Sequence, residues 1–230
     1  YGHYLLGFLM VLQRSEGGNT AYYLGEVSAA GSRSYFPLVY AIKEPLAYII
    51  LIVFSIFIAV KKCVKHCKDR EARNLVQDFI AALKNNFAEA GMLFIVLIYW
   101  IFSIRSNLNI GVRHMLPAIP FMYALAARQL AYWVRDETIL GIKKYAGFWQ
   151  TLKLQWIKIK RSAVISLFIL WAVISVIFVY PSFLAYFNEI AGGPDKGYAF
   201  VVDSNLDWGQ DISRLADYIE KNNIKEIKMD

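Results

Sequence analysis

Apolar residues gather in four blocks along the chain, separated by polar and charged stretches. The blocks lie near residues 45–60, 87–104, 115–134 and 163–180. A helix that crosses a bilayer needs about 20 largely apolar residues. The first block is shorter than that, but the lysines at its two ends, Lys43, Lys61 and Lys62, can extend toward the interfaces. The pattern therefore predicts about four membrane-spanning helices.

The two ends of the chain differ from these blocks. Residues 1–12 are apolar but too few to cross a membrane alone, so they either end an earlier span or lie in the interface as a helix. Pro181 ends the fourth block, and the chain after it is soluble in character. We therefore expect a mainly α, polytopic helical membrane protein. Residues 1–44 precede its membrane region at 45–180, and a soluble segment follows over 181–230.

Within the soluble segment the pattern indicates the beginning of a small α/β domain. Gly192-Gly193-Pro194 predicts a turn, and Ala199–Val202 predicts a short strand. A helix is expected after a cap at Asp203 or Ser204. Its apolar face would carry residues at spacings of four, three and four, namely Trp208, Ile212, Leu215 and Ile219.

Lysines and arginines in the predicted loops set the orientation, because cytoplasmic loops carry an excess of them. Seven lie between the first two blocks: Lys61, Lys62, Lys65, Lys68, Arg70, Arg73 and Lys84. Seven more lie between the last two: Arg135, Lys143, Lys144, Lys153, Lys158, Lys160 and Arg161. The connection between the second and third blocks has only Arg105 and Arg113. We therefore expect residues 61–86 and 135–162 in the cytoplasm, and residues 1–44, 105–114 and 181–230 outside.

The composition agrees with a membrane protein and argues against a nucleic-acid-binding protein. Hydrophobic residues make up 57% of the 230 residues, above the roughly 45–50% of a soluble domain. The net charge is +7, but it lies between apolar blocks rather than in a patch on a polar domain. Because the chain begins at Tyr1 without an initiator Met and ends at Asp230 just after an amphipathic stretch, we expect a fragment truncated at both ends.

Three cationic side chains lie at the same predicted depth, at the outer ends of the first and third blocks. Lys43, Arg113 and His114 are explained either as interface anchors and helix caps or as ligands of an anion. Arg grips a phosphate through two parallel hydrogen bonds, whereas Lys acts as a point charge. Because the phosphate of a lipid lies at this depth, the three are candidate ligands of a lipid phosphate.

Acidic residues of the outer segments are weaker candidates for substrate or metal contacts. Asp203, Asp207 and Asp211 recur every four residues, so on a helix they would share one slowly drifting face. Three carboxylates there can hold a divalent metal, but the solvated face of an amphipathic helix explains the same spacing. Glu26, which follows two tyrosines closely, suits acid–base chemistry or sugar binding.

Three outer stretches carry a family resemblance and occur in order along most of the chain. They are Gly18–Ser28 with Tyr35-Phe36-Pro37 and Lys43-Glu44-Pro45; Gly111–Pro117; and Phe187-Asn188-Glu189 with Gly192-Gly193-Pro194 and Asp203–Asp211. Together they resemble the bacterial relatives of dolichyl-phosphate-mannose–protein mannosyltransferases, that is, glycosyltransferase family 39 and its neighbours, with the C-type membrane glycosyltransferase fold. Two positions depart from the family pattern: Glu44 stands where Thr is expected, and Ser32-Arg33-Ser34 where aromatic residues are usual.

The resemblance implies an enzyme that transfers a sugar from a polyprenyl-phosphate-linked donor to a protein or glycan acceptor on the outer face of the membrane. The catalytic acidic residue of that family lies in its first exterior loop, outside this fragment, so no catalytic residue is assigned. Lys43, Arg113 and His114 fall within the matching motifs and are assigned to the donor phosphate. Glu44 beside Lys43 weakens an anion site at that position.

Two other functions fit the same pattern. A non-catalytic accessory or scaffold protein would use its exterior segment to bind a partner. A transporter or flippase of lipid-linked sugars would also bind a lipid phosphate, but the internal repeats typical of transporters are not evident. No predicted span carries an ionisable residue at its centre, which argues against a proton pump or ion transporter.

Overall fold

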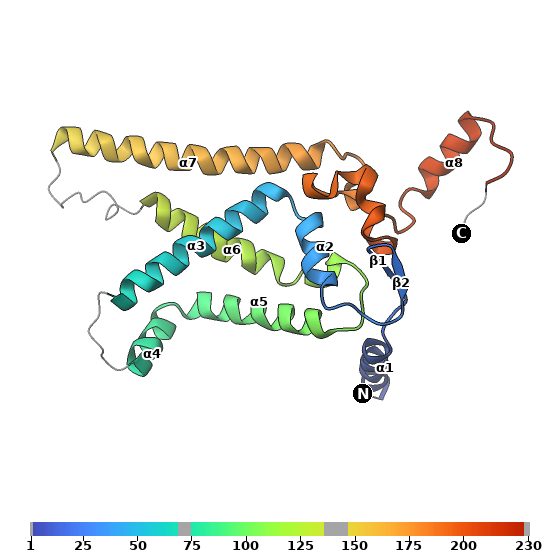
Figure 1. Cartoon of the computed structure of the whole chain (residues 1–230), viewed down its shortest axis with the longest axis horizontal. Helices are drawn as coiled ribbons and strands as arrows, with labels where there is room; N and C mark the ends of the chain where they lie inside the picture. Colours follow the sequence, from blue (N-terminus) through green and yellow to red (C-terminus); the bar gives the residue numbers. More distant parts are fainter. Residues whose placement is uncertain (1, 69–74, 136–146, 228–230) are drawn as a thin grey trace. The chain divides into compact units, whose positions relative to one another are not determined.

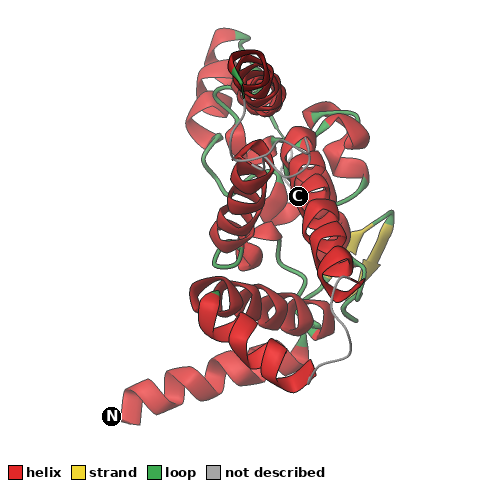
Figure 2. Ribbon diagram, turned by 90° about the vertical axis from the view of Figure 1, so that its left-hand side faces the viewer, coloured by secondary structure: helices red, strands yellow, loops and turns green. Residues whose placement is uncertain are grey.

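The computed structural model describes residues 2–68, 75–135 and 147–227 (Figure 1). The chain is mainly helical, and its described strands form one small antiparallel hairpin (Figure 2). It divides into two compact units, each considered by itself. The hairpin unit comprises Tyr1–Lys43, Ser106–Val112 and Val176–Asp230, and the bundle unit comprises Glu44–Arg105 and Arg113–Ser175.

The bundle unit is built almost entirely from helices. Its elements are α3 (Leu46–Lys68), α4 (Leu75–Asn85), α5 (Phe87–Arg105), α6 (Ile119–Arg135), most of the 3-10 turn η1 (Val112–Met115) and most of α7 (Phe148–Ile177). Helix α6 packs against both α3 and α5. Ala47 on α3 and Ala126 on α6 are buried, and such small side chains allow helix backbones to approach closely.

Three of the described helices are long and apolar enough to cross a membrane: α3 over Leu46–Lys65, α5 and α7. Helix α6 was expected to span residues 115–134, but it begins at Ile119 and has 17 residues. Pro117 and Pro120 explain the later start, because proline lacks an N–H and is tolerated only in the first turn of a helix. The described residues therefore contain three candidate spans, whereas the sequence predicted four.

Helix α7 departs most from the expected bounds, because it has 30 residues and begins at Phe148 rather than near residue 163. Trp149 and Trp156, which lie before the predicted fourth block, belong to this same helix and are exposed. No glycine or proline interrupts the sequence between 148 and 177, so nothing breaks the helix where the apolar residues begin. The remaining parts of the predicted basic loops, residues 69–74 and 136–146, lie outside the described residues.

The hairpin unit is built from short elements. Its parts are α1 (Gly2–Gly17), β1 (Ala21–Tyr23), β2 (Glu26–Ser28), α2 (Tyr35–Lys43), the turns η3 (Phe183–Ala185), η4 (Glu189–Ala191), η5 (Pro194–Ala199) and η6 (Asp203–Asn205), and α8 (Ile212–Lys221). Its core holds Tyr35, Val39, Phe187 and Val201, each at most 2% exposed. These four residues come from α2 and from the chain after α7, so the core joins distant parts of the sequence.

The C-terminal segment follows the sequence prediction only in part. The turn at Gly192-Gly193-Pro194 is confirmed, with φ of +80° at both glycines. The predicted strand over Ala199–Val202 is wrong: Ala199 belongs to η5, and only Val201 pairs, in a single bridge to Tyr23. Strand β1 has only three residues, and its other edge pairs with β2. The chain around Val201 can therefore form little more than this one bridge to it.

Candidate functional site

Asn205 is the centre of a buried polar cluster that joins the three segments of the hairpin unit. Its side chain is 2% exposed. Its Nδ2 donates to the Tyr35 hydroxyl at 3.0 Å and to the Val202 carbonyl at 3.2 Å, and its Oδ1 accepts from the Val112 backbone N–H at 3.4 Å. A buried amide is stable only when its donors and acceptors are paired. One residue of the Asp203–Asp211 motif therefore holds α2 and the 106–112 segment together.

The neighbouring contact requires a glycine. Ser204 Oγ donates to the Ile110 carbonyl at 2.6 Å. Gly111 follows with a φ of +106°, and a Cβ built there would lie 2.9 Å from Ser204 Oγ. Both the backbone conformation and the close approach exclude a side chain. The glycine of the second family-like motif thus packs against the serine of the third.

Asn188 fastens the same C-terminal segment to the end of α2. Its backbone N–H donates to the Ile42 carbonyl at 2.9 Å, and its Nδ2 donates to the Ala41 carbonyl at 2.7 Å. Its Oδ1 accepts from the Ile190 backbone N–H at 3.1 Å. With 1% of the residue exposed, Asn188 satisfies carbonyls at a helix C-terminus that have no partner within the helix.

Lys43 lies at the C-terminus of α2 and is bound by protein atoms. Its Nζ donates to the carbonyls of Leu184 and Asn205, each at 2.6 Å, and lies 4.2 Å from the centre of the Phe187 ring. Burial lowers the pKa of Lys43 to about 8. Two of the three ammonium donors are therefore used within the hairpin unit, which favours a clamping role for this predicted phosphate ligand.

Arg113 and His114 lie on η1, directly after Gly111, and are counted with the bundle unit. Arg113 is half-buried and His114 is exposed. Partial desolvation, and to a lesser degree the neighbouring Arg113 charge, lower the pKa of His114. The pair of predicted phosphate ligands therefore consists of a guanidinium that stays charged and an imidazole whose charged form is disfavoured.

Glu44, the departure from the family pattern, has a partner of its own within the bundle unit. Its carboxylate accepts a hydrogen bond from the Tyr123 hydroxyl, and the Tyr123 ring packs edge-on against Tyr48 at 5.4 Å. Burial raises the pKa of Glu44, and the hydrogen bond from Tyr123 opposes that rise. The acid is thus held by α6.

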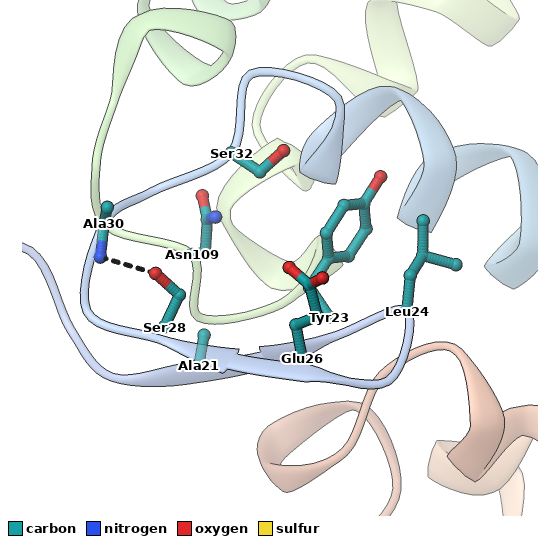
Figure 3. Close-up of a pocket in the computed structure, with 8 residues that line it drawn as sticks. All are labelled: Ala21, Tyr23, Leu24, Glu26, Ser28, Ala30, Ser32 and Asn109. Atoms are coloured by element: carbon teal, nitrogen blue, oxygen red, sulfur yellow. Dashed lines mark hydrogen bonds between the residues drawn. The ribbon is translucent and has the colours of Figure 1, made fainter.

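A polar hollow lies over one face of the hairpin and contains Glu26 (Figure 3). Its volume is about 380 Å³. Its lining residues are Ala21, Tyr23, Leu24, Glu26, Ser28, Ala30, Ser32 and Asn109. Asn109 is 5% exposed, and its Oδ1 has no hydrogen-bond partner. Glu26, one of the weaker candidates from the sequence, thus lines a hollow.

The three predicted aspartates do not share a helix face. Asp203 lies on η6, Asp207 in the following loop, and Asp211 at the N-cap of α8, which begins only at Ile212. Asp207 Oδ1 accepts from the Trp208 and Gly209 backbone N–H groups at 2.8 and 3.1 Å, a local bonding pattern that competes with a helix. The side chain of Asp203 is outside the described part, and the described side chains contain no three-residue metal-ligating group.

Asp211 forms an ion pair with Arg214 one turn along α8. Arg214 also donates to Ser182 Oγ at 3.0 Å, which ties α8 to the segment after α7. Trp208, expected on the apolar face of this helix, precedes it and is 68% exposed. The prediction of a helix starting at Asp203 or Ser204 is therefore wrong, because Gly209 has a φ of +83° and the Asp207 turn occupies the preceding residues.

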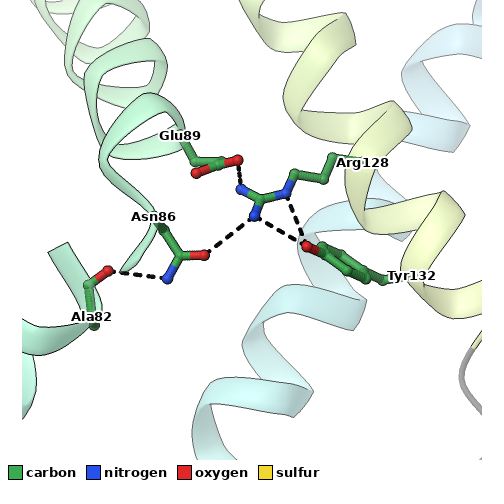
Figure 4. A network of polar contacts seen from close by, with 5 residues as sticks. All are labelled: Ala82, Asn86, Glu89, Arg128 and Tyr132. Atoms are coloured by element: carbon green, nitrogen blue, oxygen red, sulfur yellow. Dashed lines mark hydrogen bonds and ion pairs between the residues drawn. The ribbon is translucent and has the colours of Figure 1, made fainter. Parts of the chain in front are cut away.

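The bundle unit contains a polar network that the sequence pattern did not single out (Figure 4). Arg128 of α6 forms an ion pair with Glu89 of α5 and donates to Asn86 Oδ1 at 3.3 Å. It also donates to the Tyr132 hydroxyl at 3.1 Å. Arg128 lies inside a predicted span, and ionisable residues within spans are usually paired. Its position was the only signal of this network in the sequence.

Comparisons of this chain with models of known protein families, with curated proteins and with solved structures found no match.

Proposed function

We propose that this chain is part of a polytopic membrane glycosyltransferase. It transfers a sugar from a polyprenyl-phosphate-linked donor to a protein or glycan acceptor on the outer face of the membrane. In this proposal α3, α5, α6 and α7 are four spans, residues 1–44, 105–114 and 181–230 lie on the outer side, and the basic stretches 61–86 and 135–162 lie on the cytoplasmic side.

One observation carries this proposal. Parts of all three family-like segments, far apart in the sequence, belong to one compact unit, namely residues 18–43, 111–112 and 187–211. Their contacts run through motif residues: Asn188 to the end of α2, Ser204 to Ile110, and Asn205 to Tyr35 and Val112. These segments are the ones that the distribution of lysine and arginine assigns to a single side of the membrane.

The connectivity supports four spans rather than three. The chain leaves the hairpin unit before α3, returns to it after α5, and returns again after α7. If α3, α5 and α7 cross a bilayer, all three segments share one side only when α6 crosses as well. Its 17 residues extend about 26 Å at 1.5 Å per residue, and local thinning of a roughly 30 Å core absorbs the difference.

The exposed side chains of the long helices support a lipid environment. Val53 and Ile56 on α3, Phe94 on α5, and Leu167 and Leu170 on α7 are each more than half exposed. Long helices with apolar side chains on their exposed faces are usually covered by protein or by a membrane. Lipid tails around these helices would remove this surface from water.

In the proposed reaction the acceptor hydroxyl attacks the anomeric carbon of the donor sugar. The bond from that carbon to the phosphate oxygen breaks, and the phosphate stays on its lipid. The acceptor proton passes to the carboxylate that the family resemblance places in another part of the enzyme. Arg113 is proposed to bind the departing phosphate and stabilise its growing charge, with His114 as a hydrogen-bond donor. Lys43 holds the hairpin unit together instead.

The test uses the full-length protein in nanodiscs with radiolabelled hexoses on polyprenyl phosphate. Wild type is compared with Arg113→Ala and with Arg105→Ala, an exposed arginine of the same predicted outer connection that serves as the matched control. We expect release of sugar from the lipid by wild type and by the control, and at least a tenfold lower rate for Arg113→Ala. Equal rates in both variants would remove Arg113 from the site. No release from any donor would favour an accessory protein.

A further inference from the structure

We propose that the hollow over the hairpin is a binding site for a neutral, hydroxyl-rich ligand, the pyranose ring of a hexose. This inference rests on the proposed function for its biological setting, but its binding chemistry is independent of any transfer reaction. The hollow lies wholly within the hairpin unit.

The hairpin presents one of its two faces to the hollow. Ala21 pairs with Ser28 and Tyr23 pairs with Glu26, and alternate residues of a strand point to the same side. All four line the hollow, whereas the intervening pair, Tyr22 and Val27, does not. The register of β1 and β2 therefore places the Glu26 carboxylate, the Ser28 hydroxyl and the Tyr23 ring on the same side of the hairpin.

Another side of the hollow is formed by a residue that lies more than 80 positions after β2 in the sequence. Asn109, from the 106–112 segment, is nearly fully buried and lines the hollow with an Oδ1 that accepts no hydrogen bond. Buried polar atoms in proteins are nearly always paired, so the buried Oδ1 of this lining residue is an acceptor that lacks a donor. Figure 3 shows the Asn109 carboxamide beside Ser32 on the side opposite the strands.

The remaining polar groups offer both donors and acceptors. Ser28 Oγ accepts from the Ala30 backbone N–H at 3.1 Å, which leaves its own O–H free to donate. Ser32 Oγ shares a hydrogen bond of 2.9 Å with Ser34 Oγ, which also accepts from the Tyr23 hydroxyl. Sugar hydroxyls both donate and accept, and adjacent hydroxyls suit the two oxygens of a carboxylate such as Glu26.

The lining excludes the alternative ligands. No lysine, arginine or histidine is among the described lining residues, so a phosphate has no cation to bind there. Glu26 is the single carboxylate among the described lining residues, which is too few charged ligands for calcium or magnesium. A volume of about 380 Å³ lies at the lower end of the range for small-molecule pockets, about 300–1,000 Å³. A compact, uncharged polyol is the class that fits.

The sugar has two sources, which the probes distinguish. The methyl α-glycosides of mannose, glucose and galactose represent a free glycan acceptor, and the same hexoses on polyprenyl phosphate represent the donor. Binding of each is measured to the full chain in nanodiscs. Glu26→Gln keeps the shape of an exposed side chain and removes its charge. Asn109→Ala removes the unpaired acceptor, and Val27→Thr, on the opposite face of β2, is the matched control.

We expect wild type and Val27→Thr to bind at least one class of probe equally, and Glu26→Gln and Asn109→Ala to bind it at least tenfold more weakly. A loss confined to the lipid-linked hexoses assigns the hollow to the donor sugar, and a loss confined to the free glycosides assigns it to the acceptor. Affinities of Glu26→Gln within twofold of the control, or no binding of any probe by wild type, overturn the inference.

A parallel measurement of sugar release from the donor keeps the two proposals apart. Binding that depends on Glu26 without any release by wild type supports the sugar site and contradicts the transferase. Release by wild type that is accompanied by unchanged binding in Glu26→Gln and Asn109→Ala supports the transferase and overturns the sugar site.

Discussion

Replacing Asn205 by Ala removes the residue that joins all three segments of the hairpin unit. The substitution deletes donations from Nδ2 to the Tyr35 hydroxyl and the Val202 carbonyl, and acceptance by Oδ1 from the Val112 N–H. The backbone carbonyl of residue 205, which binds Lys43, is kept. The substitution therefore tests the side-chain hydrogen bonds of Asn205 separately from the hydrogen bonds of Lys43.

The magnitude follows from the bonds lost and the groups left unpaired. A net contribution near 1 kcal/mol for each hydrogen bond gives a loss of about 3 kcal/mol, and the desolvated partners prevent recovery of this energy from water. For a chain of this size 1 kcal/mol lowers the melting temperature by roughly 2–4 °C. Asn205→Ala is therefore expected to lower it by about 6–12 °C.

The assay is thermal unfolding of the purified protein in one detergent, followed by tryptophan fluorescence. Asn222→Ala is the matched control, because Asn222 is exposed and its Nδ2 bonds only the local Tyr218 carbonyl at 2.8 Å. We expect it to change stability by at most about 0.5 kcal/mol. Hydrogen exchange should also rise in residues 106–112 and 35–43 of Asn205→Ala alone. A melting temperature equal to that of the control would refute the assigned role of the cluster.

Three further predictions concern other contacts. Gly111→Ala should lower the free energy of unfolding by about 1–3 kcal/mol, because residue 111 has a φ of +106° and a Cβ there has no space. Gly91→Ala on α5, where a Cβ meets nothing within 4 Å, should raise it by about 0.5–1 kcal/mol in the same thermal assay. Burial lowers the pKa of Lys43 from 10.5 to about 8, so between these pH values the unfolded chain binds a proton that the folded chain does not. Stability relative to Lys43→Met should therefore rise with pH across this window, and a difference that falls with pH contradicts the lowered pKa. A double-mutant cycle of Glu89→Gln and Arg128→Gln should give a coupling of about 0.5–3 kcal/mol, whereas additive effects would mean that the ion pair contributes nothing.

Local patterns in the sequence were sufficient for two of the long helices and for the grouping of the segments predicted to lie outside. Apolar length placed α3 and α5 because this signal depends only on consecutive residues. The loop charges separated residues 1–44, 105–114 and 181–230 from the rest. The hairpin unit consists of nearly the same segments, namely Tyr1–Lys43, Ser106–Val112 and Val176–Asp230.

The details of the site depend on contacts that no local pattern reveals. Asn205 and Tyr35 are 170 positions apart, and Asn188 and Ala41 are 147 apart. Lys43 had the right location for a phosphate ligand, but its carbonyl partners lie more than 140 positions away. The start of α8 was misplaced because the side-chain bonds of Asp207 outweighed a weak helical spacing.

The proposed topology places the three segments of the hairpin unit on the outer side of the membrane. Single cysteines introduced in a cysteine-free background as Val27→Cys, Asn107→Cys and Tyr198→Cys, all at exposed positions, are exposed to a membrane-impermeant maleimide on intact cells. Trp149→Cys, at the exposed start of α7, is the control for the opposite side. We predict labelling of the first three in intact cells and labelling of Trp149→Cys only after permeabilisation. Protection of any of the first three, or labelling of Trp149→Cys from outside, would contradict it.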